Sequence, residues 1–130
     1  MGDLTKNISR HELACNCGCG LDSMDFETIR LVQDTCDYFA IKTGKVKVTL
    51  IINSAARCFE YNRKPVSEGG PGSNDASQHP RCRALDFKIL DVSPDEVYDY
   101  LTKRYPGKYG FGKYDTFTHA DTRTNGPARW

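Results

Sequence analysis

One six-residue stretch, Ala84–Ile89, constrains the fold of this chain more than any other feature. Successive side chains of a β-strand point to opposite faces, so Leu85, Phe87 and Ile89 share one face. Asp86 falls in the middle of the other face, next to a small side chain. The pattern predicts a strand whose apolar face packs on a core, while the opposite face is open and carries a carboxylate.

Two other segments have the features of helices. Apolar residues recur at helical spacing from about 24 to 40, and Asp22 or Ser23 is positioned to cap that helix. Ser93 begins the sequence Ser-Pro-Asp-Glu, which matches an N-terminal capping box with proline at the first helical position. The second helix is expected to end near residue 105.

The remaining strands and the fold class follow from β-rich segments and loops. Residues 46–52 predict a central strand, residues 67–74 a flexible loop, and residues 108–113 and 116–121 two further strands. Helices and strands do not alternate regularly, so we expect an α+β fold rather than a parallel sheet. The expected architecture is a small antiparallel sheet with flanking helices, in a single domain over residues 1–130.

Composition excludes several classes of protein. The chain has 130 residues, 18 basic and 17 acidic, with a formal net charge of +1. This balance argues against a nucleic-acid binder, and a hydrophobic fraction of 38% with many aromatic residues argues against disorder. No apolar run approaches the roughly 20 residues of a membrane span, and the N-terminus lacks the apolar region of a signal peptide. We expect a monomer that does not insert into membranes and carries no export signal.

The six cysteines leave three interpretations open. They are reduced thiols, ligands of a metal, or partners in disulfides. Half of them lie in one short motif, and the full set is Cys15, Cys17, Cys19, Cys36, Cys58 and Cys82. Structural zinc sites are typically built from cysteine pairs at two separated places in the sequence. This chain instead has a single motif of three alternating cysteines, C-x-C-x-C.

Two histidines and an aspartate, His79, His119 and Asp86, form a candidate metal site. His79 lies seven residues before Asp86, and the strand expected near the C-terminus places His119 and Asp121 on one face. Two histidines and one aspartate from neighbouring strands are a common zinc ligand set, with the fourth position left for water. Taken singly, each residue is better explained without a metal, each histidine by a local hydrogen bond and each aspartate by exposure to solvent.

The joint pattern resembles a known family. Residues 77–86, Ser-Gln-His-Pro-Arg-Cys-Arg-Ala-Leu-Asp, resemble the S-x-H-x-x-G-x-A-x-D signature of the M15 zinc peptidases. Residues 53–57 followed by Asn62 are similar to the S-G-Y-R-S…N segment that precedes the signature, and residues 117–130 are similar to the terminal F-x-H-x-D-T…R-x-W. Residues 9–20 resemble the F-A-C-x-C-G-C motif of the small phage-type branch.

This resemblance implies a fold, a cofactor and a substrate. The fold would be that of DD-peptidases and hedgehog domains, with the zinc site on the open sheet face. One zinc ion per chain would be held by His79, Asp86 and His119. Arg57 would bind a carboxylate of the peptidoglycan stem peptide through its two-pronged guanidinium group, and Ser77 is assigned to substrate binding. The implied activity is peptide-bond hydrolysis in the bacterial cell wall, by a phage or prophage endolysin released through a holin or carried in the virion.

Two positions depart from the family pattern. Cys82 occupies the glycine position of the signature, which suggests that this bend does not need a positive φ. Thr116 occupies the position of the glutamate that serves as general base in many members. Asp121 would lie about 6.6 Å along the strand from His119, whereas Asp115 would lie about 13 Å away. Asp121 is therefore our candidate for the base, with orientation of a ligand histidine as an equally weighted role.

Two other functions remain open. The first is a zinc-containing module that binds peptidoglycan without turnover, which the loss of the usual glutamate supports. The second takes Cys15, Cys17 and Cys19 as the functional metal site of a nucleic-acid or structural zinc module. The neutral charge and the single cysteine motif argue against the second.

Overall fold

A computed structural model describes the chain over two ranges, 2–74 and 76–130. Short 3-10 helices, written η, connect the longer elements. In chain order the described elements are η1 Arg10–Leu13, α1 Phe26–Lys42, β1 Leu50–Ser54, α2 Phe59–Arg63, η2 Val66–Glu68, η3 His79–Arg81, β2 Ala84–Ile89, α3 Pro94–Arg104, β3 Gly110–Lys113, β4 Thr118–Asp121 and β5 Ala128–Arg129. Every helix in the described ranges is too short or too polar to cross a lipid bilayer.

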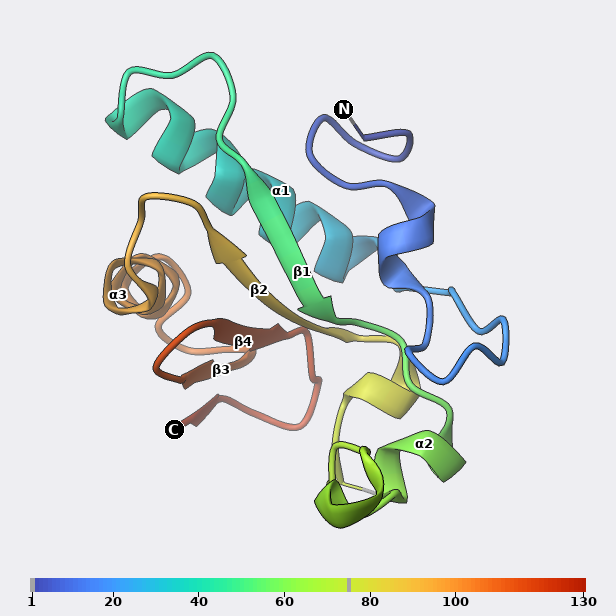
Figure 1. The fold of residues 1–130 in the computed structure, drawn as a ribbon. Helices are drawn as coiled ribbons and strands as arrows, with labels where there is room; N and C mark the ends of the chain where they lie inside the picture. The colour runs from blue at the N-terminus through green and yellow to red at the C-terminus, as the bar shows by residue number, and fades with distance from the viewer. Residues whose placement is uncertain (1, 75) are drawn as a thin grey trace.

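The strands form one five-stranded sheet in the order β1-β2-β4-β3-β5. β1, β2, β4 and β3 pair in antiparallel fashion, and the two-residue β5 pairs with β3 in parallel. The expected α+β class is confirmed. The sheet is mixed rather than purely antiparallel, because a short return of the C-terminus adds β5 at its edge (Figure 1).

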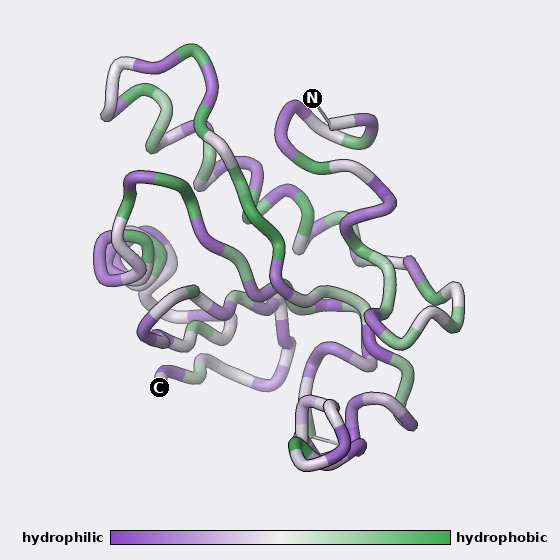
Figure 2. Tube along the Cα trace, viewed as in Figure 1, coloured by the Kyte–Doolittle hydropathy of each residue, from purple (hydrophilic) through white to green (hydrophobic). Residues whose placement is uncertain are grey.

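The two long helices pack against one side of this sheet. α1 contacts β2 and β4, while α3 contacts β2, β3 and β4 (Figure 1). Leu85, Phe87 and Ile89 of β2 are buried in the core that these helices cover, as the alternation of β2 predicts. Figure 2 shows the hydrophobic run along β1 and the largely hydrophilic segment around α2. The opposite face of β2 carries Asp86, whose side chain is also buried.

Both predicted helices are present, with shifted limits for the first. α1 begins and ends two residues later than expected, and Asp25 caps it in place of Asp22 or Ser23 by accepting a hydrogen bond from a backbone amide of the first turn. Phe26, which the helical spacing assigns to the core, is 65% exposed. Ser93 caps α3 as predicted, because its hydroxyl accepts a hydrogen bond from the backbone N–H of Glu96.

The prediction of a central strand over 46–52 is wrong in position. β1 begins at Leu50 and lies at the edge of the sheet. The residues before it bind the N-terminal segment instead, since the Asn7 side chain donates to the carbonyl of Val48 and the Lys6 ammonium donates to the carbonyl of Val46. A continuous apolar run does not distinguish an edge strand from a central one when loops cover part of it.

The C-terminal strands are shorter than predicted. A hairpin turn interrupts the pattern, with the backbone N–H of Tyr114 donating to the carbonyl of Phe117. β3 therefore ends at Lys113 and β4 begins at Thr118. β5 was not predicted, because two residues carry no detectable periodicity.

Candidate functional site

A row of residues crosses the open face of the sheet. Asp86 on β2 pairs with His119 on β4, and His119 pairs in turn with Gly112 on β3. On the other side Asp86 is opposite Ser54 of β1, next to a bulge in the pairing. Directly opposed residues of antiparallel strands have Cβ atoms about 4.5–5.5 Å apart, so this register alone brings Asp86 and His119 together.

His79 reaches the same place from η3. Its ring is buried, and its Nδ1 lies 2.6 Å from the backbone carbonyl oxygen of Ala55. A carbonyl only accepts hydrogen bonds, so Nδ1 donates its proton to Ala55 and Nε2 is the ring nitrogen left for another partner. Nε2 faces the Asp86 carboxylate at 3.2 Å. The sheet and the loop together thus direct Nε2 of His79 toward the Asp86 carboxylate.

A residue with left-handed backbone conformation connects η3 to β2. Cys82 has φ 58° and ψ 40°, and its backbone N–H donates to the carbonyl of His79. The prediction that this bend does not need a positive φ is therefore wrong. The bend has a left-handed conformation, which glycine adopts without cost and which a cysteine adopts here.

Three predicted ligands come together in the structure. One donor atom from each of His79, Asp86 and His119 lies within 4.8 Å of the other two, and all three residues are buried. Nδ1 of His119 lies 2.9 Å from one Asp86 oxygen, and Nε2 of His79 lies 3.2 Å from the other. Two imidazoles and one carboxylate suit zinc, which commonly takes three protein ligands and keeps one position open in catalytic sites. The residues present therefore fit a zinc ion.

Asp121 lies on the other side of the His119 ring. Its carboxylate accepts a hydrogen bond of 2.7 Å from Nε2 of His119, and its side chain is fully buried. Arg123 donates two further hydrogen bonds to it from its guanidinium group, at 2.8 and 2.7 Å. The bond to Asp121 fixes the proton of His119 on Nε2 and leaves Nδ1 to face Asp86.

The charges of this network shift the pKa values of its members. Burial opposes ionisation of Asp121, but the hydrogen bonds from Arg123 and His119 outweigh it and hold the pKa of Asp121 well below its usual range. Burial likewise opposes ionisation of Asp86, and His119 and His79 outweigh it, so the Asp86 pKa is also low. Burial disfavours the charged form of His119, yet Asp121 and Asp86 together raise its pKa.

Glycines in β3 make room for the side chains above this face. A Cβ atom at Gly112 would lie 2.4 Å from Nε1 of Trp130, whose ring centroid is 4.9 Å from that of His119. A Cβ atom at Gly110 would collide with the carboxylate of Asp121. Both positions share the His119 face, so their lack of a side chain permits the packing around His119.

Arg57 is held beside Asp86 by three side chains. Its guanidinium donates to the hydroxyl of Ser54 at 2.9 Å, to the amide oxygen of Asn62 at 3.2 Å and to Asp86 at 3.2 Å. Burial lowers the pKa of Arg57, while Asp86 favours its charged form. Ser54, Arg57 and Asn62 are the residues on which the family resemblance of this segment depends, and the structure joins them in one cluster.

A cavity of about 380 Å³ opens above the three candidate ligands. Ser77 and Arg57 line it, as does Arg123, to which the sequence analysis gave no role. Aromatic side chains also line it, namely Tyr114, Phe117 and Trp130. Phe117 and Trp130 belong to the C-terminal motif, the only signal in the sequence that could have identified them, whereas Tyr114 lies outside it.

Asp115, the acidic residue compared with Asp121 as a possible general base, lies away from this cavity. Asp115 and Thr116 are exposed in the turn between β3 and β4 and are not among the residues that line the cavity. Within the described ranges, Asp86 is the only carboxylate that lines it.

A comparison with models of protein families finds a match. The family model described as Peptidase M15 matches residues 6–121, which include all three candidate ligands. Searches of curated proteins and of solved structures find no significant match. M15 peptidases are zinc enzymes that hydrolyse peptide bonds. Because the match covers most of its length, the chain belongs to the peptidase M15 family and is a metallopeptidase by that membership.

Proposed function

We propose that this protein is a zinc peptidase that hydrolyses peptide bonds in peptidoglycan stem peptides, with the whole chain acting as one domain. The observation that carries the proposal is the pair of imidazoles at the base of the cavity. Each has one nitrogen fixed by a buried acceptor, Ala55 O for His79 and Asp121 for His119, and directs the other nitrogen toward Asp86. Such acceptors are typical of histidines that bind metals.

The lining of the cavity supports an anionic peptide as substrate. Arg57 and Arg123 both line it, and their side chains are 11% and 19% exposed. A guanidinium group binds a carboxylate through two parallel hydrogen bonds, and stem peptides carry free carboxylates. Arg57 has three protein partners that fix its orientation, so it meets a substrate carboxylate with little further loss of side-chain entropy.

The residues divide into ligands and positioning groups. When bound, zinc polarises the scissile carbonyl and lowers the pKa of a water molecule to about 7. His79, Asp86 and His119 would hold it. Asp121 acts as a positioning residue, because it faces Nε2 of His119 rather than the Nδ1 side where the ligands converge. Ser77 accepts a hydrogen bond from the backbone N–H of His79 and supports the loop at the cavity edge.

A module that binds peptidoglycan without turnover is the second candidate. It is favoured by the lack of a second carboxylate among the described residues that line the cavity, since a general base must come within hydrogen-bond reach of the attacking water. The two functions differ in one observable result, which is the release of new termini from peptidoglycan.

Purified sacculi test the proposal. The zinc-loaded protein should release new amino groups, and mass spectrometry of the products should show either free D-alanine or newly cut internal bonds. His79→Ala should abolish release, whereas His11→Ala, at an exposed histidine of η1, should leave it unchanged. Protein that sediments with sacculi but releases no amino groups would establish the binding module instead.

The site of action follows from the substrate. We propose that the protein acts on the bacterial cell wall as a monomeric endolysin of a phage or prophage, reaching its substrate through a holin or as part of a virion. A lysis assay on cells expressing the protein with and without a holin tests this, since lysis should require both.

A further inference from the structure

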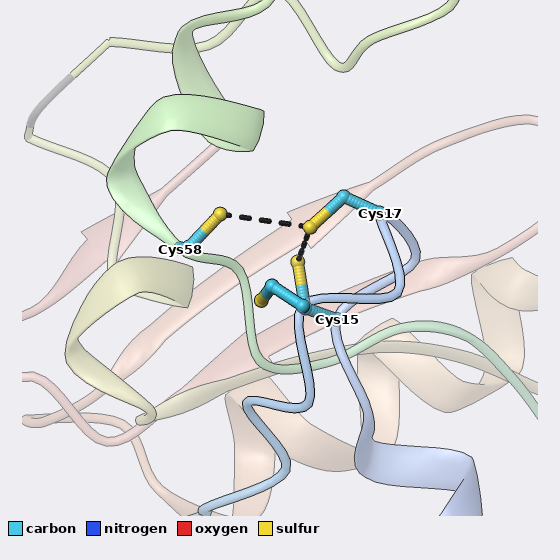
Figure 3. A group of neighbouring side chains, drawn as sticks. Cys15, Cys17 and Cys58 are labelled. Atoms are coloured by element: carbon cyan, nitrogen blue, oxygen red, sulfur yellow. Dashed lines mark hydrogen bonds between the residues drawn. The ribbon is translucent and has the colours of Figure 1, made fainter.

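Four cysteines converge at a second place in the molecule. Cys15, Cys17 and Cys19 come from the loop after η1, and Cys58 comes from the N-terminus of α2. The four sulfur atoms all lie within 4.8 Å of one another. Figure 3 shows the side chains of Cys15, Cys17 and Cys58 pointing toward one another, although Cys58 is 41 residues from Cys17.

The loop between the cysteines is folded tightly enough to present its thiols on one side. The backbone N–H of Cys15 donates to the carbonyl of Leu21 at 2.7 Å and closes the loop. Gly18 and Gly20 have φ values of +82° and +92°, so each reverses the chain directly after a cysteine. On the opposite side, the backbone N–H of Tyr61 donates to the sulfur of Cys58 at 3.4 Å and orients it.

We propose that Cys15, Cys17, Cys19 and Cys58 bind a structural zinc ion, distinct from the ion at His79, Asp86 and His119. Zinc–sulfur bonds of about 2.3 Å in a tetrahedron place sulfur atoms about 3.8 Å apart. The Cys15–Cys17 and Cys17–Cys58 sulfur distances are 3.4 and 3.7 Å. Both are close to the tetrahedral value and far from the roughly 2.05 Å of a disulfide.

The two zinc sites differ in chemistry. Four thiolates fill the coordination shell of zinc and leave no position for water, which is typical of structural sites. The His79 site has three candidate ligands beside a cavity. Cys17 and Cys19 are exposed, so zinc has a direct path to the cysteine cluster from solvent.

The location of the cluster gives the second ion a role in positioning the active site. Residues 55–58 run between the two sites, with the carbonyl of Ala55 bonded to His79 and Arg57 bonded to Asp86. On their other side the backbone N–H of Ala56 donates to the carbonyl of Leu13, two residues before Cys15. Zinc bound by Cys15 and Cys58 would fasten the N-terminal loop to this segment.

Counting zinc in matched variants tests the proposal. Protein purified under reducing conditions and dialysed against zinc should hold two ions per chain by elemental mass spectrometry. His79→Ala combined with His119→Ala should lower the count to one, and so should Cys17→Ser combined with Cys19→Ser. The control Cys82→Ser, which changes a cysteine outside the cluster, should keep two ions.

Cobalt identifies the ligands in case a cysteine variant folds poorly. The histidine double variant keeps all four cysteines, so its cobalt-loaded form should show strong thiolate-to-cobalt charge-transfer absorption. That absorption should be lost in Cys17→Ser combined with Cys19→Ser. Wild-type protein with a single zinc ion that the histidine substitutions remove entirely would overturn the proposal, as would a cobalt spectrum without thiolate bands.

Discussion

His119 is the residue on which the proposed chemistry depends most. Asp86 and Asp121 contact its two ring nitrogens, and in the metal-free protein these two carboxylates favour the protonated ring and raise its pKa. A zinc ion would replace the proton on Nδ1 and leave the bond to Asp121 in place. The role of Asp121 therefore follows from the nitrogen that it binds.

Asp121→Asn should weaken zinc binding. An amide neither carries the charge that favours the Nε2 proton nor pairs with Arg123, so zinc affinity should fall about 10- to 100-fold, with activity largely restored by excess zinc. Competition with a chelator measures the affinity. Asp115→Asn, in the exposed turn between β3 and β4, should change nothing. Full zinc affinity with kcat lowered by about 10² or more would instead make Asp121 the general base.

Arg57→Lys should impair substrate use although it keeps the charge. A lysine ammonium has no planar fork and cannot bridge Ser54, Asn62 and Asp86 while binding a carboxylate in two places. We expect a higher KM and a lower kcat/KM on stem peptides, measured beside Arg30→Lys, which changes an exposed arginine of α1. Equal kinetics for the two variants would mean that Arg57 does not bind the substrate.

At the scale of elements, β3 determines what lies above His119. Gly110 and Gly112 alternate with Phe111, whose ring is fully buried in the core on the opposite face. The strand therefore has a packed side and a bare side. Trp130, which follows β5, occupies the space above the bare side next to His119.

Gly112→Ala should displace the ring of Trp130. The added methyl group would lie 2.4 Å from the indole nitrogen, and overpacking of this kind costs about 1–3 kcal/mol of unfolding free energy. Emission from this single tryptophan should shift to longer wavelength as the ring becomes more exposed. Gly107→Ala is the control, because no atom lies within 4 Å of its added Cβ. The same emission and stability in both variants would contradict this packing.

Local patterns in the sequence predicted which helices and strands form. They were less able to predict which of these elements lie next to one another in space. The alternation in Ala84–Ile89 identified β2 and both of its faces, because a strand covered on one side leaves that period in the sequence. The edge position of β1 depends on hydrogen bonds that the N-terminal segment makes far from it in sequence. Periodicity contains no information on such contacts.

At the scale of the whole molecule, the same distinction separates the two proposed metal sites. His79, Asp86 and His119 were predicted together because strand parity and one motif relate them. Cys58 was not joined to Cys15, Cys17 and Cys19, because the link depends on how α2 packs against the N-terminal loop. The sequence contains no second cysteine motif, whereas the fold brings Cys58 to the first one as a fourth ligand.

The stability of the molecule should fall at alkaline pH because of a buried thiol. Burial, with a smaller effect from Asp37, raises the pKa of Cys36 to about 12 from an ordinary value of 9.0. Between these values the unfolded chain has lost the proton and the folded chain still binds it. The free energy of unfolding should therefore be unaffected by Cys36 below pH 9 and fall by about 1.4 kcal/mol per pH unit above it.

Urea unfolding of wild type and Cys36→Ala between pH 8 and 11 measures this effect. The variant should be less stable at pH 8, because it leaves a cavity beside α1, and it should lose less stability as the pH rises. Other groups with raised pKa values, such as Tyr109, contribute equally to both proteins. Identical slopes would show that Cys36 is not buried from solvent as described.

Anomalous X-ray scattering tests the central claim most directly. Crystals of the zinc-loaded protein, measured on both sides of the zinc absorption edge, should show a peak among His79 Nε2, His119 Nδ1 and Asp86, about 2.0–2.2 Å from each ligand atom. The peak should disappear in His79→Ala crystals. An anomalous map without a peak at these three residues, from protein that hydrolyses peptidoglycan, would contradict the assignment of His79, Asp86 and His119 as the zinc ligands of the enzyme.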